Sequence, residues 1–171
     1  VVTAYNKLPY EASINVIAPE GAYILMNNIS VINSVEEDQL IFGGEAQIYV
    51  TIQNVGQDTS SALAVTLHNN DGSINILNNE IIVETISPDI QTTIGPFEIE
   101  VNWNIENGSE IELQLSIEDE SQIWDYSTTR TVLSPDFQTE IMNIIDNGNG
   151  IFDPGETVFL EVSLINIGGA S

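Results

Sequence analysis

The residues best suited to chemistry lie in one acidic, glycine-rich stretch near the end of the sequence. Oxygen-bearing side chains occur there at Asp146, Asn149, Asp153 and Glu156, and the intervening glycines let the backbone curl around a centre. Calcium is bound by six to eight oxygens, backbone carbonyls included, at about 2.3–2.6 Å. We predict a calcium site made by these four side chains and the carbonyl of Ile151. The spacing is not that of an EF-hand, and a glycine turn with solvated carboxylates is the alternative.

A second acidic stretch, residues 34–45, occupies the corresponding place in an earlier part of the chain. It keeps a Gly-Glu pair but lacks the alternating Asn and Gly residues, and it has Phe42 where the later stretch has Asp153. Glu36, Glu37 and Asp38 could hold an ion weakly. A solvated turn is the preferred interpretation, because runs of charge are usually surface features.

Catalytic combinations of residues are weak. There is no cysteine, which excludes thiol catalysis, disulfides and cysteine-type zinc sites. His68, the single histidine, precedes a turn and is expected at the surface. The 26 acidic residues make chance carboxylate pairs inevitable, so they carry little evidence for a glycosidase. We therefore predict that this chain is not an enzyme.

The net charge of −24, with only two basic residues, limits the partners further. Binding of phosphate backbones and of anionic membrane surfaces requires clusters of Lys and Arg, so neither nucleic acid nor a membrane surface is an expected partner. No apolar run is long enough for a membrane span, so membrane insertion is not expected either. The expected partners are therefore neighbouring domains of the same chain, other copies of the chain, or a cell-surface or glycan partner.

Three aromatic residues could bind a sugar by stacking. Trp103, Trp124 and Tyr126 would form such a platform if they shared an exposed surface. They also follow the alternation of predicted strands, where aromatic residues are usually interior. Core packing is therefore preferred, and a carbohydrate-binding module is kept as an alternative function.

The elements that position these residues are β-strands. Apolar residues alternate with polar ones in four segments, and the segments are separated by Asn, Gly, Pro and Asp turns. The alternating sets are Ile48, Val50 and Ile52; Leu63, Val65 and Leu67; Phe97, Ile99 and Val101; and Ile111, Leu113, Leu115 and Ile117. Short strands at this spacing, without helical periodicity, predict an all-β, immunoglobulin-like antiparallel β-sandwich.

An internal repeat divides the chain. Residues 44–56 (GEAQIYVTIQNVG) resemble residues 155–168 (GETVFLEVSLINIG), and Asn54 and Asn166 lie 112 positions apart. A repeat of domain size indicates tandem modules. The expected domains are the tail of a preceding module at 1–20, a complete module at 22–137, and the start of a following module at 138–171. The chain is expected to be an excerpt of a larger protein, because a third of a sandwich cannot bury a core.

Three segments also resemble a known family. Residues 2–10 (VTAYNKLPY) are similar to the closing strands of the immunoglobulin-like domain that follows the catalytic domain in gingipain-type cysteine peptidases. Residues 44–56 and 146–168 resemble the tandem repeats of such peptidases and of related bacterial surface proteins. The resemblance implies an exported, multidomain protein whose catalytic residues lie outside this segment.

The predicted function is a non-catalytic, extracellular or cell-surface spacer or adhesion segment. Calcium at residues 146–156 is expected to stiffen the junction between modules by neutralising carboxylates in a glycine-rich linker. The main alternative is a subunit of a filament or surface layer, in which incomplete ends complete each other by strand exchange.

Overall fold

The computed structural model describes residues 5, 17, 19–35, 38–145, 148, 150–151 and 154–170. These residues form eleven β-strands and no helix, so they contain no helix that could cross a membrane. The strands are β1 Ile24–Ile32, β2 Leu40–Ile41, β3 Glu45–Asn54, β4 Leu63–His68, β5 Ile74–Ile76, β6 Glu80–Val83, β7 Gln91–Val101, β8 Glu110–Glu118, β9 Ile123–Leu133, β10 Phe137–Ile145 and β11 Phe159–Asn166. The predicted all-β class is confirmed.

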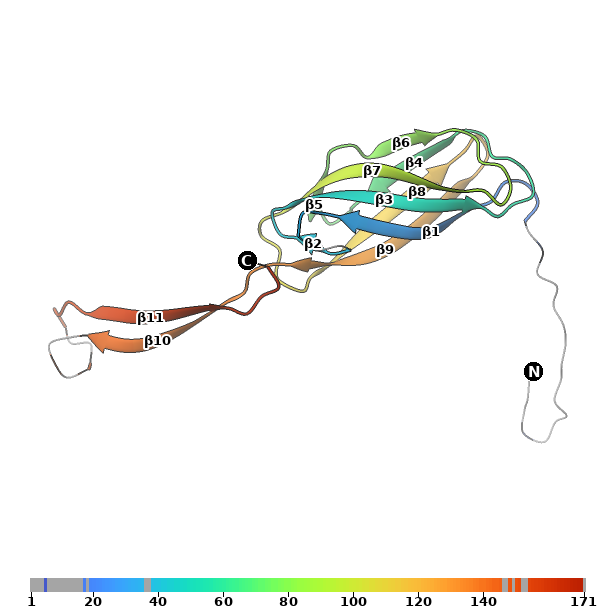
Figure 1. Cartoon of the computed structure of the whole chain (residues 1–171). Helices are drawn as coiled ribbons and strands as arrows, with labels where there is room; N and C mark the ends of the chain where they lie inside the picture. The colour runs from blue at the N-terminus through green and yellow to red at the C-terminus, as the bar shows by residue number, and fades with distance from the viewer. Residues whose placement is uncertain are drawn as a thin grey trace.

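Two sheets pack face to face as a sandwich. One has the strand order β1-β3-β7-β5 and the other the order β2-β9-β8-β4-β6 (Figure 1). All pairings are antiparallel except that of β2 with β9, in which Leu40 pairs with Val132 and Ile41 with Leu133. The strand alternation did not predict this short parallel pair, because β2 has only two residues. The fold is an immunoglobulin-like β-sandwich.

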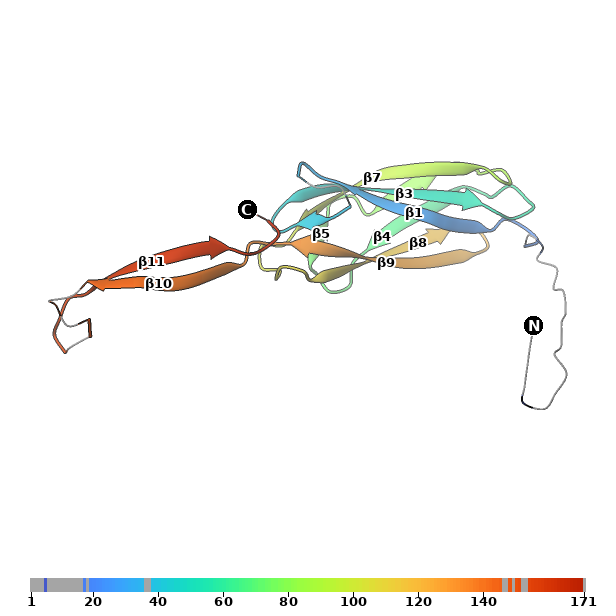
Figure 2. The ribbon, with the colours of Figure 1, turned by 60° about the horizontal axis from the view of Figure 1, so that its bottom comes forward.

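A separate two-stranded sheet, β10 with β11, projects from one end of the sandwich as an extended arm (Figures 1 and 2). β10 runs away from the sandwich and β11 returns to it, with Phe137 paired with Asn166 at the near end and Ile145 with Phe159 at the far end. Both sheets of the sandwich fall within the range predicted for the complete module. The module boundaries themselves stay a prediction, and the range assigned to a preceding module lies mostly outside the described residues.

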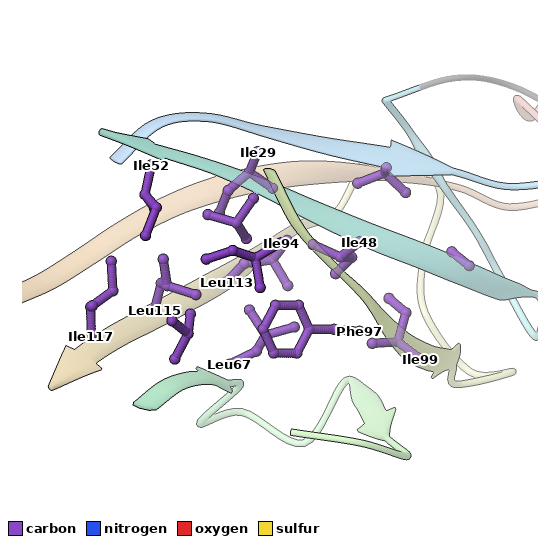
Figure 3. Close-up of a cluster of buried hydrophobic side chains, with 14 of the residues drawn as sticks. Ile29, Ile48, Ile52, Leu67, Ile94, Phe97, Ile99, Leu113, Leu115 and Ile117 are labelled. Carbon is purple, nitrogen blue, oxygen red and sulfur yellow. The ribbon is translucent and has the colours of Figure 1, made fainter. Parts of the chain in front are cut away.

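The apolar residues of all four predicted strand sets point into the space between the two sheets. Ile48, Val50 and Ile52 of β3 have no exposed surface. Ile48 and Ile52 face β8 across the core (Figure 3). Phe97 of β7 is the largest fully buried side chain and lies among Ile48, Leu67 and Ile99. Burial of this kind stabilises the fold by about 25 cal/mol per Å² of apolar surface. The alternation of apolar residues therefore explains why the two sheets pack face to face.

One open edge of the sandwich is closed by side chains of β9 that reach β1 in the other sheet. The hydroxyl of Tyr126 donates a hydrogen bond to the carbonyl of Ile24, and the guanidinium of Arg130 donates one to the carbonyl of Ile29. Burial, and to a lesser degree the proximity of Tyr23, raises the pKa of the Tyr126 phenol above its ordinary value of 10.0. These contacts tie the sheets where β1 and β9 approach each other without a ladder.

Candidate functional site

The predicted calcium stretch, residues 146–156, connects β10 to β11. Because β10 leads away from the sandwich, this connection lies at the far end of the arm (Figure 1). The expectation that calcium bound at residues 146–156 stiffens a junction between modules stays a prediction.

Three of the five predicted ligands, Asp146, Asn149 and Asp153, lie outside the described residues, so the calcium site itself stays a prediction. Ile151 is exposed and Glu156 is half-buried. Three glycines of this stretch, Gly148, Gly150 and Gly155, have positive φ, as a tight turn requires. Among the residues that the structure describes, no group of three or more acidic or histidine side chains could hold a metal ion.

In the earlier acidic stretch, residues 34–45, Asp38 closes a turn that precedes the short strand β2. The carboxylate of Asp38 accepts a hydrogen bond from the amide of Val31 at 3.1 Å, and the amide of Asp38 donates to the Val31 carbonyl at 3.0 Å. Glu36 and Glu37 lie outside the described residues. Asp38 thus has a structural partner, in keeping with the preferred interpretation as a turn.

The three aromatic residues do not form a platform. Trp124 is buried and packs edge-on against Tyr23, with ring centroids 6.4 Å apart. Tyr126 uses its hydroxyl to tie the sheets. Trp103 is 76% exposed in the loop after β7, where its ring packs edge-on against that of Phe42, with ring centroids 5.5 Å apart. The prediction of core packing is right for Trp124 and wrong for Trp103, because the strand that was expected to carry Trp103 ends at Val101.

The residues considered for a hydrolase lie in separate places on the sandwich. His68 is exposed at the end of β4 and lines a groove of about 450 Å³ together with Glu112 and Asp125 on the outer surface of the second sheet. The two carboxylates whose pKa values differ from the ordinary value, Asp71 and Asp119, do not line this groove. Hydrogen bonds from Ser73 lower the pKa of Asp71, and hydrogen bonds from the Ser121 region outweigh burial to lower that of Asp119. A general acid requires a raised pKa, so neither carboxylate is suited to that role.

One buried polar side chain of the sandwich is Asn54, which marks the internal repeat in the sequence. Asn54 is fully buried at the end of β3. Its Oδ1 accepts hydrogen bonds from the amides of Tyr23 (3.1 Å) and Gly56 (3.0 Å). Its Nδ2 donates to the carbonyls of Asp58 and Ile86, both at 2.8 Å. All four hydrogen-bonding positions of this amide are therefore used, which fixes the chain on both sides of β3.

Asn166 makes the same arrangement at the end of β11. Its Oδ1 accepts from the amides of Asp136 and Gly168, both at 3.0 Å, and its Nδ2 donates to the carbonyl of Ala170 at 2.6 Å. The amide of Ile167 donates to the Asp136 carbonyl, as that of Val55 does to Tyr23. The contact with Ile86 is the one contact of Asn54 without a counterpart at Asn166 among the described residues.

The glycine of each Asn-x-Gly motif has a steric reason. A Cβ on Gly56 would lie 2.2 Å from the carbonyl oxygen of Gly21, and a Cβ on Gly168 would lie 2.3 Å from that of Ser134. Neither distance is tolerable, so both motifs require glycine. The repetition of Asn-x-Gly was the signal in the sequence that could have identified Asn54 and Asn166 as hydrogen-bonding centres.

The junction between the sandwich and the arm is organised by Asn107, in the loop between β7 and β8. Its Oδ1 accepts hydrogen bonds from the amide of Ser134, before β10, at 3.1 Å and from that of Gly169, after β11, at 3.0 Å. The hydroxyl of Ser134 donates to the carbonyl of Ile105 at 2.6 Å. One side chain of the sandwich thus holds both ends of the arm. In the sequence, Asn107 belongs to a Glu-Asn-Gly turn at residues 106–108, which does not by itself indicate this role.

The arm also carries exposed apolar residues in both strands. In β11, Leu160, Val162 and Leu164 are 46%, 51% and 61% exposed. Ile141 of β10 pairs with Val162 and is likewise exposed. A row of this kind is typical of an interaction surface, because single scattered apolar residues are normal and contiguous ones are not.

No family model and no curated protein sequence matches the chain. Solved structures do match. One is native alpha-2-macroglobulin from Escherichia coli, residues from domain MG7 to the C-terminus, with a TM-score of 0.52, 13% identity and 74% of this chain covered. A cryo-EM structure of native Escherichia coli alpha-2-macroglobulin has a TM-score of 0.50, 13% identity and 72% coverage.

This chain spans 18% of the first matched chain and 7% of the second. At 13% identity the likeness shows the fold alone. The comparisons therefore agree with the topology: the chain has an all-β, immunoglobulin-like fold of the kind found as a small part of a much longer bacterial protein.

Proposed function

We propose that the chain is a non-catalytic, rigid spacer made of immunoglobulin-like modules within a larger protein. The observation that carries the proposal is the double hydrogen bond of Asn107, which attaches the arm to the sandwich at both of the arm's ends. A linker of only three residues, 134–136, separates β9 from β10. A short linker with hydrogen-bonded ends resists bending, whereas a long Gly- or Ser-rich linker would behave as a flexible coil.

The wider context of the spacer is inferred from the sequence. Its resemblance to repeats of gingipain-type peptidases and bacterial surface proteins supports an exported parent protein and an extracellular or cell-surface location. The net charge of −24 supports a role that keeps surfaces apart and in solution, because like charge opposes close association. Adhesion would require a partner surface, and the exposed Trp103 beside Phe42 is one aromatic position where it could begin.

Calcium at residues 146–156 belongs to this proposal. Bound at residues 146–156, it would order the far end of the arm, away from the sandwich. The support is the number of oxygen ligands in the sequence and the positive-φ glycines, Gly148, Gly150 and Gly155, that let the chain turn tightly there. In a tandem array this end would face the next module.

The test of the spacer is a distance measurement between the sandwich and the arm. The chain has no cysteine, so the pair Ser127→Cys and Glu161→Cys, on β9 and β11, introduces two unique sites for spin labels. Pulsed electron spin resonance should give one narrow distance distribution. Asn107→Ala should broaden it, because the amides of Ser134 and Gly169 then lose their shared acceptor.

Asn75→Ala is the matched control. Asn75 also makes an exposed side-chain hydrogen bond, to Glu100, but it lies in β5 of the sandwich. It should leave the distribution unchanged. A broad distribution already present in the unsubstituted pair would contradict the rigid spacer.

A further inference from the structure

One face of the arm's two-stranded sheet carries an apolar residue at three successive positions of β11. Successive side chains of a strand point to opposite faces, so Leu160, Val162 and Leu164 share one face. Their ladder partners on β10 include Ile144, opposite Leu160, and Ile141, opposite Val162. Glu161 and Ser163 belong to the other face, which also carries Phe159 and Ile165. The arm therefore has an apolar face and a mixed one.

The register of the arm equates this face with the buried face of β3. In the sandwich, Val31 pairs with Ile48, and Ile24 pairs with Asn54. In the arm, Ile144 pairs with Leu160, and Phe137 pairs with Asn166. Each ladder also contains one register shift. Leu160, Val162 and Leu164 thus stand where Ile48, Val50 and Ile52 stand in β3, as the two arrangements of Asn54 and Asn166 independently require.

What covers the β3 face in the sandwich is known. β7 pairs along the edge of β3 that β1 leaves free, with Ile48 opposite Phe97 and Val50 opposite Ile94. Leu113, Leu115 and Ile117 of β8 cover the face from the other sheet (Figure 3). As a result, Ile48, Val50 and Ile52 have no exposed surface, whereas their counterparts in the arm are about half exposed.

We infer that the apolar face and the free edge of β11 are a docking surface for further β-strands of the same polypeptide, which complete a second sandwich module. One occupant strand would pair antiparallel along β11 in the place of β7. A facing sheet with alternating apolar residues would cover Leu160, Val162 and Leu164. The added strands would also bring a carbonyl that accepts a hydrogen bond from Nδ2 of Asn166, as the Ile86 carbonyl does from Nδ2 of Asn54. This inference rests on the proposed modular spacer, because it identifies what the spacer's arm binds.

The edge that the strand would occupy can be assigned to particular amides. The backbone N–H of Asn54 donates away from β1, to the carbonyl of Ile90 at 3.1 Å. Its counterpart, the N–H of Asn166, therefore points away from β10. Because donors alternate along an antiparallel strand, the N–H of Leu164 points the same way. These two amides would be protected only when a strand pairs with the free edge of β11.

The test is hydrogen exchange of the natural full-length protein. The amides of Leu164 and Asn166 should exchange at least about 100-fold more slowly than in a free strand edge, at every protein concentration. Exchange at the unprotected rate would overturn the inference. Protection that grows with concentration, together with a dimer or polymer by mass measurement, would overturn it in favour of a second copy as the occupant.

A pair of substitutions separates the two faces. Leu164→Lys puts a charge on the apolar face, and Ser163→Lys puts the same charge on the other face, opposite Glu140. Leu164→Lys should abolish protection of the Asn166 amide, whereas Ser163→Lys should preserve it, and β3 should remain protected in both. Equal effects of the two variants would contradict the assigned face. The distance measurement of the spacer is unaffected by this result, so the two proposals can fail separately.

Discussion

A buried carboxamide that satisfies four backbone groups at once is an efficient way to fix the end of a strand. Asn54 has this role: its side chain joins its own turn, through Gly56 and Asp58, to two segments that are distant in the sequence, at Tyr23 and Ile86. An Asp at this position could accept but not donate, so it would repel the two carbonyls. The chemistry therefore requires Asn, whereas a turn alone would accept several residue types.

Asn54→Ala should lower the free energy of unfolding by about 3 kcal/mol or more, because it leaves several buried backbone groups without a partner. Chemical denaturation measures the change. Asn27→Ala is the control, since Asn27 makes two hydrogen bonds to Gln53 and Gln91 at the exposed surface. Its effect should stay within about 0.5 kcal/mol. Similar losses in both variants would show that the buried network has no special importance.

The two tryptophans should differ sharply in their access to solvent. Trp103 is 76% exposed and Trp124 is 6% exposed. Acrylamide should therefore quench the wild-type emission in two components, and Trp103→Phe should remove the accessible one. Acrylamide is neutral, so the charge of −24 does not bias the measurement as it would with iodide. If Trp103→Phe showed the same quenching as the wild type, Trp103 would not be the accessible tryptophan, and its exposed position would be contradicted.

At the scale of elements, the strong alternation of β3, β4, β7 and β8 was sufficient to predict both their existence and their buried faces. The strands β1 and β9 were harder to predict, because Asn27 and Asn28 interrupt one and polar residues such as Thr128 line the other. Their inward positions are satisfied by ties across the sheets, from Tyr126 and Arg130, rather than by apolar packing alone. Such ties depend on residues about 100 positions apart and leave no local pattern.

The candidate site was predictable only in part, for the same reason. The repeat correctly pointed to Asn54 and Asn166 as equivalent positions, yet the sequence could not show what their side chains bind. Asn107 had no repeat partner to identify it. The position of residues 146–156 at the far end of the arm depends on the direction of β10. That direction is set by the pairing of β10 with β11 and not by any local motif. Long-range pairing is what a single sequence conceals.

The tie made by Tyr126 should give the sandwich a dependence on alkaline pH. Its raised phenol pKa means that the folded state holds the proton more tightly than the unfolded chain, whose phenol titrates near 10.0. The stabilisation is complete below pH 10.0 and is lost as the pH rises through the folded-state pKa. Tyr126→Phe should therefore cost about 1 kcal/mol at neutral pH and less above pH 10.0.

Urea unfolding at neutral and alkaline pH measures this difference. Tyr49→Phe is the control, because the Tyr49 hydroxyl bonds only to the exposed side chain of Gln47. That variant measures what the loss of an exposed tyrosine hydroxyl does to stability under the same conditions. A Tyr126→Phe variant whose deficit did not shrink above pH 10.0 would show that the phenol proton is not linked to folding.

The charge of the whole molecule sets its response to ions. With a net charge of −24, self-repulsion opposes the compact state. Screening shortens the Debye length from about 10 Å at 0.1 M salt to about 3 Å at 1 M, so sodium chloride alone should raise the melting temperature of the sandwich. A general effect of calcium on stability would therefore be no evidence for a calcium site. The site must be tested at matched ionic strength and at the arm.

At matched ionic strength, calcium should protect amides of β10 and β11 from hydrogen exchange and leave β3 unchanged, because the predicted ligands lie between the two strands of the arm. The double variant Asp146→Asn with Asp153→Asn should lose this response. Glu110→Gln with Glu118→Gln is its control, since it removes the same charge from the exposed side of β8. If both double variants responded alike, calcium would act on the arm only by screening, and residues 146–156 would be a plain turn.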